Sequence, residues 1–193
     1  MKFTKDEIRK SMLLYAVTDQ MWLKDGEKLA DVVESVLKNG ATFLQIREKD
    51  LAEDAFEAEA ERLKTLCAQH GIPFVVNDSV EIALQCDADG VHVGQSDIKG
   101  RDIRAIIGAD KILGISAGTV AEAVAAEKAG ADYIGVGAVF PTGTKKNATP
   151  MTMEQLKEIV SSVSIPVVAI GGIGAGNILQ LFFTVGLERI NIK

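Results

Sequence analysis

The stretch YIGVGAVFPTGTKKNATP, residues 133–150, joins a short apolar run to a loop of hydroxyl groups and lysines. The apolar part is too short for a typical helix and has the composition of a buried strand. The loop that follows contains Gly143 between two threonines and then the pair Lys145 and Lys146. Hydroxyls, a backbone N–H that glycine leaves accessible and an ammonium group are suited to binding an anion. The stretch therefore predicts a strand whose carboxyl end carries an anion site, with a mobile surface loop as the alternative.

The same alternation continues in both directions along the chain. Seven strands are predicted from short apolar runs, at residues 13–18, 43–47, 74–77, 90–94, 112–117, 133–140 and 166–171, with an eighth at 188–192. Helical patterns separate them, at residues 27–38, 53–69, 79–85, 103–107, 120–128, 153–161 and 177–183. A strand followed by a helix, repeated in this way, predicts an α/β fold with a parallel sheet covered by helices.

Eight such units predict one domain, residues 1–193, that forms a (β/α)₈ TIM barrel. An open doubly wound sheet is the rival fold, and the absence of a G-x-G-x-x-G turn after the first strand disfavours it. Few residues follow the eighth strand, so we expect the barrel to lack its last helix. In such barrels the active site lies at the carboxyl ends of the strands, which directs attention to the residues there.

The bulk composition excludes several other classes of protein. The formal net charge of −6 disfavours a protein that binds the phosphate backbone of nucleic acids, because such proteins usually carry a clustered basic face. Two cysteines, Cys67 and Cys86, form neither a disulfide framework nor a zinc motif. The apolar patch at 12–17 is too short for a signal peptide, and no segment has the length of a membrane span. We expect a cytoplasmic protein.

The end of the second predicted strand carries cationic side chains on one face. Alternation along the strand places Gln45, Arg47 and Lys49 together, opposite the apolar residues. An arginine fork and a lysine aimed at one place indicate an anion site of the phosphate kind. An ion-paired rim formed with Glu48 and Asp50, or with a neighbouring acid, is the alternative.

Two aspartates follow the next two strands, Asp78 after the third and Asp97 after the fourth. Carboxylates that meet beside a bound phosphate suit Mg²⁺, which takes few protein oxygens and shares those of the substrate. Either residue could instead cap a helix, as Asp78 could at the helix expected from residue 79. The cationic strand end nearby favours the metal interpretation.

Two further polar residues are expected on inward faces of strands. His92 alternates with glycines and should point into the barrel, where a hydrogen-bonded structural histidine is favoured over a catalytic one. Ser116, at the end of the fifth strand, lacks the G-x-S-x-G context of a nucleophile, so a hydroxyl donor to a ligand is the alternative. The glycine-rich stretch AIGGIGAGN, residues 169–177, predicts a close backbone approach to a phosphate or a plain tight turn.

Taken together, six segments resemble the thiamin phosphate synthase family. The matching segments are LYAVTD, GATFLQIREKD, VNDSVEIAL, ADGVHVGQSD, GADYIGVGAVFPTGTKKNATP and IPVVAIGGIGAGN, in the order in which the family has them. They cover most of the chain between residues 14 and 177. The resemblance implies a (β/α)₈ barrel that couples a pyrimidinylmethyl diphosphate to a thiazole phosphate, with Mg²⁺, and releases pyrophosphate.

The resemblance also implies roles for individual residues of this chain. The expected substrate-binding set is Gln45, Ile46, Arg47, Glu48, Lys49, Asn77, Ser116, Thr142, Gly143, Thr144, Lys145 and Gly172. Within it, the expected catalytic residues are Arg47, Lys49, Ser116 and Lys145. The expected metal ligands are Asp78 and Asp97. The reaction would be a dissociative displacement that needs positioning and charge stabilisation more than a nucleophile or a general base.

The last segment, residues 178–193, departs from the family pattern. It lacks the small-residue phosphate loop that the family has after its last strand, and its apolar side chains would favour self-association. Two other functions are therefore considered. One is a truncated barrel that binds a phosphate or diphosphate without turnover. The other is an isomerase of the thiazole tautomerase type, which the cationic strand end and the aspartate pair disfavour.

Overall fold

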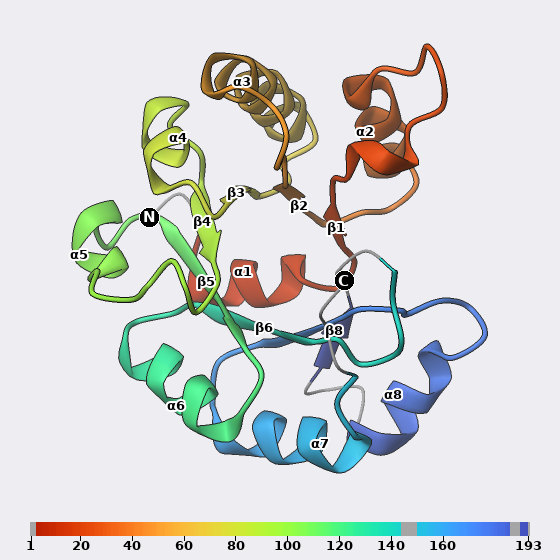
Figure 1. The fold of residues 1–193 in the computed structure, drawn as a ribbon, viewed down its shortest axis with the longest axis vertical. Helices are drawn as coiled ribbons and strands as arrows, with labels where there is room; N and C mark the ends of the chain where they lie inside the picture. The colour runs from red at the N-terminus through yellow and green to blue at the C-terminus, as the bar shows by residue number, and fades with distance from the viewer. Residues whose placement is uncertain (1–2, 144–149, 186–189, 193) are drawn as a thin grey trace.

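The computed structural model describes residues 3–143, 150–185 and 190–192. Eight parallel strands form one sheet in chain order, each hydrogen-bonded to the next (Figure 1). The strands are β1 (Tyr15–Val17), β2 (Phe43–Ile46), β3 (Phe74–Asn77), β4 (Gly90–Val93), β5 (Ile112–Ala117), β6 (Tyr133–Gly137), β7 (Val167–Ile170) and β8 (Ile190–Ile192). No hydrogen-bonded pair among these residues joins β8 back to β1. The (β/α)₈ prediction is confirmed as a nearly closed barrel.

Helices surround the strands, as the strand–helix alternation predicted (Figure 1). They are α1 (Lys5–Ser11), α2 (Leu29–Lys38), α3 (Glu53–Gln69), α4 (Val80–Gln85), α5 (Ile103–Ile107), α6 (Val120–Lys128), α7 (Met153–Ser162) and α8 (Ile178–Val185), with a 3₁₀ turn η1 (Gln20–Trp22). Strand β8 is the last element of the described residues. None of the described helices is long and apolar enough to cross a bilayer.

The sequence prediction missed α1. Its start is marked by a capping box, in which the Thr4 side chain accepts a hydrogen bond from Glu7 N and the Glu7 carboxylate accepts one from Thr4 N. The T-x-x-E pattern is visible in the sequence and could have located this helix. Another difference is that β6 ends at Gly137, whereas the apolar run continues to residue 140. Beyond Gly137, Val139 N donates to Ile170 O at the end of β7, and Phe140 N donates to Gly171 O just after it.

The outward face of the strands packs against the helices. This layer is an apolar cluster that includes Leu44 and Ile46 of β2, Val91 of β4 and Ile134 of β6, each at most 1% exposed. Because side chains alternate across a strand, the neighbouring residues on the same strands must face the barrel interior. Burial of the outer cluster is the main stabilising term for a parallel sheet covered on its outside.

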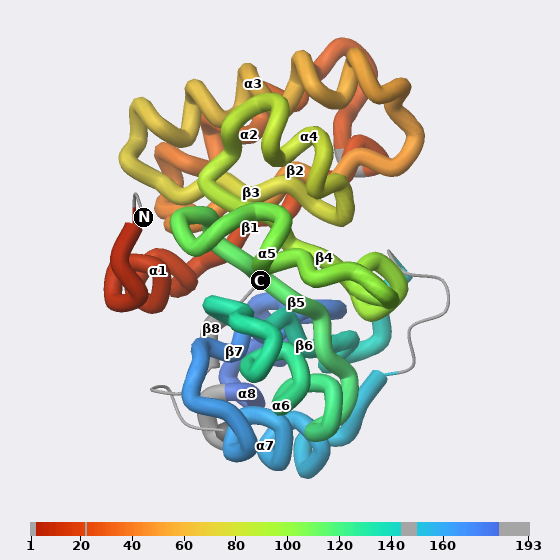
Figure 2. Tube along the Cα trace, turned by 90° about the vertical axis from the view of Figure 1, so that its left-hand side faces the viewer, coloured from red at the N-terminus to blue at the C-terminus, as the bar shows by residue number. Residues whose placement is uncertain are grey.

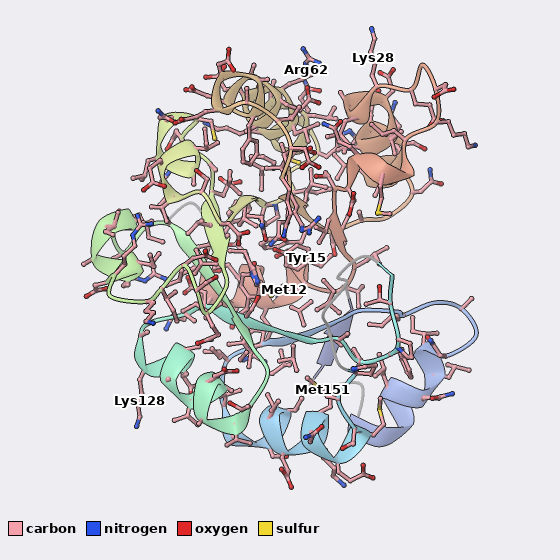
Figure 3. The ribbon with its side chains drawn as sticks, in the orientation of Figure 1. Met12, Tyr15, Lys28, Arg62, Lys128 and Met151 are labelled. Carbon is pink, nitrogen blue, oxygen red and sulfur yellow. The ribbon has the colours of Figure 1, made fainter. Side chains whose placement is uncertain are left out.

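A second, smaller cluster fills the interior near the amino ends of the strands. It contains Tyr15, Phe43 and Tyr133, together with Ile8 and Met12 from the first helix and its end. Figure 2 shows α1 lying at one end of the barrel, and Figure 3 shows Met12 and Tyr15 near the centre of the ring of strands. Helix α1 therefore closes this end of the barrel, so any ligand must enter from the opposite end.

The amino end of the barrel is held together by side chains that bind backbone N–H groups of the preceding strand. Thr42 accepts from Leu14 N at 2.9 Å, and Asp89 accepts from Phe74 N at 3.0 Å. In the third such bond Asp132, the residue before β6, accepts from Leu113 N of β5 at 2.9 Å. These three bonds join strands in the pairs β1–β2, β3–β4 and β5–β6.

Candidate active site

The carboxyl ends of all eight strands lie at the end of the barrel opposite α1, because the sheet is parallel. Gln45 of β2 points into the interior, as predicted, and is 1% exposed. Its Nε2 donates to the Tyr15 hydroxyl at 2.9 Å. The outward neighbour Ile46 is fully buried among the apolar residues that face the helices. Its side chain therefore lies away from the interior, and its backbone is the part that borders the strand end.

The residues after β2 form contacts with the segment after β1. Arg47 N donates to Thr18 Oγ1 at 2.9 Å, and its guanidinium lies 3.3 Å from the Asp19 carboxylate. Glu48 lies beside the same segment, where burial raises the pKa of its carboxyl and hydrogen bonds from Gln20 and Thr18 oppose that rise. The ion-paired rim considered as an alternative is thus present in part, with Asp19 as the acid that contacts Arg47.

Asp78 and Asp97 approach each other at the ends of β3 and β4. Partial burial and the neighbouring Asp97 carboxylate raise the pKa of the Asp78 carboxyl, whereas Asn77 and the Lys49 ammonium lower it. Asp78 is held by its backbone N–H, which donates to His92 O at 2.8 Å. The structure therefore brings Lys49, Asn77 and the two aspartates together, as the sequence predicted.

Neither aspartate caps helix α4. The cap is Ser79, whose hydroxyl accepts from Ile82 N at 3.2 Å. Asp78 has a φ of 64°, an uncommon conformation that aspartate and asparagine tolerate better than most residues. The Asp97 carboxylate accepts from Gly94 N at 2.8 Å and from the Ser96 hydroxyl at 3.3 Å, which fixes its position.

The Asp97 carboxylate helps to raise the pKa of the Asp78 carboxyl, and a divalent cation between the two groups would remove this repulsion. Within the described ranges no group of three or more His, Cys, Asp or Glu side chains could hold a metal. A pair of carboxylates suits Mg²⁺, which usually keeps several waters and shares oxygens with phosphates. The donor set present is thus compatible with the predicted ion when a substrate completes it.

Ser116 of β5 lies at the edge of the interior, half-buried. Its hydroxyl is 3.0 Å from His92 Nε2, and its carbonyl accepts from Gln95 Nε2 at 2.6 Å. His92 points inward, as predicted, and is 4% exposed. Its other ring nitrogen lies 2.9 Å from the Tyr133 hydroxyl, so the structural interpretation of this histidine is the one its contacts favour.

The loops after β6 and β7 pack tightly on each other. Phe140 N donates to Gly171 O at 3.0 Å, and a Cβ at Gly172 would collide with Pro141 O and lie 2.8 Å from Phe140 O. Gly172 also has a φ of 65°, so both the space and the backbone favour glycine there. Thr142 and Gly143 continue directly from this contact. The remaining predicted residues of the loop, Thr144 and Lys145, lie outside the described residues.

Sequence reasoning missed several polar residues that support the site. Asp19 and Thr18 follow β1, and their polar types at a strand end were a usable signal. Gln95 was passed over although it precedes the predicted metal ligand Asp97 by two residues. Tyr133 was classed only as strand, although it shares the inward face with Gly135.

Comparisons with known proteins identify the family of this chain. The family model described as thiamine monophosphate synthase matches residues 14–192. A thiamine-phosphate synthase of Clostridium tetani is 46% identical over 168 residues, which cover 87% of this chain and 80% of the relative. One of Clostridium botulinum is 51% identical over 160 residues, covering 83% and 75%. The family match extends into residues 178–192, where the sequence had suggested a departure.

Solved structures give the same result. A thiamine phosphate pyrophosphorylase from Pyrococcus furiosus superimposes with a TM-score of 0.84 at 36% identity, covering 96% of this chain and 87% of that one. An N-acetylmannosamine-6-phosphate 2-epimerase from Clostridium perfringens, with a TM-score of 0.63 and 13% identity, shares the fold alone. The family match over residues 14–192 and the relatives at 46–51% identity show that this chain belongs to the thiamine monophosphate synthase family.

Proposed function

We propose that this chain is a transferase that forms thiamin phosphate. Its substrates would be 4-amino-2-methyl-5-pyrimidinylmethyl diphosphate and 4-methyl-5-(2-hydroxyethyl)thiazole phosphate, and pyrophosphate would be released. The observation that carries the proposal is the meeting of the Lys49 ammonium with the Asp78–Asp97 pair at one end of the barrel. A cation beside two carboxylates is the charge pattern expected around a metal diphosphate. The cytoplasmic location and the self-association expected from the sequence stay predictions.

The cationic groups after β2 would hold the leaving group. Lys49 contributes a point charge beside the aspartate pair, and Arg47 contributes a planar fork that matches phosphate oxygens. The Asp19 carboxylate, 3.3 Å from the Arg47 guanidinium, orients that fork before any ligand arrives. A preoriented cation stabilises the negative charge that develops on a departing diphosphate without reorganisation during the reaction.

The aspartate pair would hold Mg²⁺ through Asp78 and Asp97. When bound, the ion would supply charge neutralisation to the diphosphate and help it to leave. The chain's own contribution is the fixed placement of the carboxylates, since Asp97 is held by Gly94 N and Asp78 by its backbone bond to His92 O. Rigid placement favours the octahedral geometry that Mg²⁺ requires.

The residues on the inner face would recognise the pyrimidine diphosphate. Gln45 and Asn77 offer amide groups that can both donate and accept hydrogen bonds, as an aminopyrimidine edge requires. Ser116 would donate its hydroxyl to a diphosphate oxygen. The main-chain approach of Ile46 and the position of Glu48 beside Thr18 would shape the adjoining wall.

The loops after β6 and β7 would bind the second substrate. Gly172 allows the backbone to come close to a phosphate, and Thr142, Gly143 and Thr144 offer hydroxyl and N–H donors. Lys145 would add a positive charge to the departing diphosphate. This assignment rests on the sequence motif together with the tight packing of Gly172 on Phe140.

The reaction balances without a protein nucleophile. The bond between the methylene carbon and the diphosphate oxygen breaks, and its electron pair leaves with pyrophosphate. The electron-rich aminopyrimidine stabilises the resulting carbocation, and the lone pair of the thiazole nitrogen then forms the new C–N bond. The protein supplies positioning and charge stabilisation, which account for large rate effects when reactants are held in line.

The proposal is tested by incubating the purified protein with both substrates and Mg²⁺ and measuring thiamin phosphate by chromatography. We expect Asp78→Asn to lower kcat/KM on the order of 100-fold, because it removes one carboxylate charge from the diphosphate site. Asparagine is the chosen replacement because it tolerates the φ of 64° at this position.

Asp6→Asn is the matched control, since Asp6 is exposed on α1 at the opposite end of the barrel. It should retain full activity. No thiamin phosphate from the unmodified protein, with pyrophosphate and Mg²⁺ still binding by calorimetry, would contradict the proposal and favour a barrel that binds without turnover. Equal activity of Asp78→Asn and Asp6→Asn would contradict the assigned role of the aspartate pair.

A further inference from the structure

A chain of hydrogen bonds crosses the barrel interior from β2 to β5. Gln45 Nε2 donates to Tyr15 Oη at 2.9 Å, and Tyr15 Oη lies 2.6 Å from Tyr133 Oη. Tyr133 Oη lies 2.9 Å from His92 Nδ1, and His92 Nε2 lies 3.0 Å from Ser116 Oγ. We call these five side chains the buried relay. It connects Gln45 and Ser116, which are both assigned to substrate binding. The connection runs through Tyr15, Tyr133 and His92.

The surrounding backbone leaves space for the relay. A Cβ at Gly114 would collide with the Tyr133 ring and hydroxyl and lie 2.5 Å from His92 Nδ1. A Cβ at Gly135 would lie 3.0 Å from His92 Cε1. Tyr133 is 0% exposed and His92 is 4% exposed. Two glycines on adjacent strands thus make room for a histidine and a tyrosine that bond to each other.

The chemistry of the end groups favours one direction of donation. The amide nitrogen of Gln45 can only donate, so Tyr15 Oη accepts there. If Tyr15 then donates to Tyr133, and Tyr133 to His92 Nδ1, each hydroxyl donates once and accepts once. Such a head-to-tail chain is cooperatively strengthened.

We propose that Tyr133 is a positioning residue that fixes the tautomer of His92. By donating to Nδ1 it places the single hydrogen of the neutral ring on Nε2, which donates to Ser116 Oγ. Ser116 then accepts from His92 and directs its own hydroxyl hydrogen toward the carboxyl end of the barrel. In the opposite tautomer Ser116 would donate to His92 and present only lone pairs, which repel a diphosphate oxygen. The last step rests on the proposed function, whereas the tautomer itself does not.

The tautomer is measured by ¹⁵N NMR of protein labelled at histidine, without substrate or metal. The chain has two histidines, so His70→Gln, which changes the exposed one at the end of α3, assigns the spectrum. For the unmodified protein we expect a protonated Nε2 and an unprotonated Nδ1 on His92. A protonated Nδ1, in either the other tautomer or the imidazolium, would overturn the proposal.

Two tyrosine variants separate the relay from general packing. Tyr133→Phe removes the donor to Nδ1 and should mix the tautomers of His92. Tyr15→Phe removes the hydroxyl that lies one hydrogen bond further from His92 and should leave the His92 tautomer unchanged. An unchanged spectrum in Tyr133→Phe, or an equal change in both variants, would overturn the role of Tyr133. If Tyr133→Phe does not fold, the spectrum of the unmodified protein alone decides the tautomer.

The effect on the reaction is tested by a double-mutant cycle of Tyr133→Phe with Ser116→Ala. Alone, Tyr133→Phe should lower kcat/KM for the pyrimidine diphosphate about tenfold, the effect of one misdirected hydrogen bond. In the Ser116→Ala background the same change should have little effect, because the two residues act in series. Additive losses would overturn the proposal. Absence of thiamin phosphate from the unmodified protein would instead count against the proposed function and leave the tautomer result standing.

Discussion

The two faces of the same strands differ in what they require of their residues. The outward face is uniformly apolar, as in Leu44 and Ile134, and packs on helices. The inward face carries Gln45, His92 and Ser116, whose polar atoms bond to specific partners. Outward positions need only volume and hydrophobicity, whereas inward positions need a particular donor at a particular distance. Stability should therefore respond most to outward changes and chemistry most to inward ones.

The largest stability effect is expected from the outer layer. Leu63→Ala on α3 removes a side chain that is 0% exposed and should lower the free energy of unfolding by about 2–5 kcal/mol. Leu84→Ala on α4 is the matched control, because this leucine is 43% exposed, and should change it by less than about 0.5 kcal/mol. Urea denaturation followed by circular dichroism measures both. Similar losses of unfolding free energy in Leu63→Ala and Leu84→Ala would show that the outer cluster does not contribute the stability assigned to it.

An intermediate effect is expected where the amino ends of the strands are tied. Asp132 accepts from Leu113 N and from Arg104 Nη2, at 2.9 and 2.8 Å, and its side chain is 6% exposed. Asp132→Asn should cost about 1–3 kcal/mol of unfolding free energy, because a buried donor loses its charged acceptor.

The control for this comparison is Asp87→Asn. Asp87 contacts Lys64 and Lys111, but its side chain is 78% exposed, so the loss should be at most about 1 kcal/mol. Both residues would be compared by urea midpoint at the same ionic strength. A larger loss for Asp87→Asn than for Asp132→Asn would contradict the view that burial decides the strength of these contacts.

The smallest change in the free energy of unfolding is expected from Asp78→Asn. This substitution should stabilise the protein near neutral pH, whereas the preceding ones destabilise it. Because its pKa is raised in the folded protein, the folded state holds the proton more tightly than the unfolded state does. The protein should therefore lose stability as the pH rises from the ordinary aspartate value through the raised one. Asp78→Asn removes this penalty, so its urea midpoint should match the unmodified protein in acid and exceed it near neutral pH.

Adding Mg²⁺ sharpens that measurement. At neutral pH the ion should raise the urea midpoint of the unmodified protein, since a ligand of the folded state stabilises it, and should affect Asp78→Asn much less. If the difference in urea midpoint between Asp78→Asn and the unmodified protein is the same at all pH values, the charged Asp78 carboxylate is not destabilised by its neighbours.

Most of the fold was predictable from residue patterns. The strand and helix ranges followed from apolar periodicity, and the ends of α3 and β3 agree with the predicted ranges. Boundaries failed where tertiary contacts replaced strand pairing, as at β6, whose apolar run goes on after Gly137. No helix was predicted at residues 5–11, although the capping box of α1 was legible in the sequence.

The candidate site was predictable only in part. Motifs located the cationic strand end and the aspartates, because residue type and strand position suffice for that. The pairing of Arg47 with Asp19 could not be predicted, since it joins loops that are 28 residues apart. The assignment of the α4 cap to Ser79 instead of Asp78 also needed coordinates, because both residues suit that position by type.

The sequence by itself determined the alternation of strands and helices, the inward or outward direction of each strand residue, and the residues at the strand ends. These follow from local periodicity and from the geometry of a parallel barrel. Only the tertiary structure decided that Tyr15, Tyr133 and His92 bond in series and that Arg47 pairs with Asp19. Such contacts depend on the register of strands that are distant in sequence, and a period of two residues cannot specify register between strands.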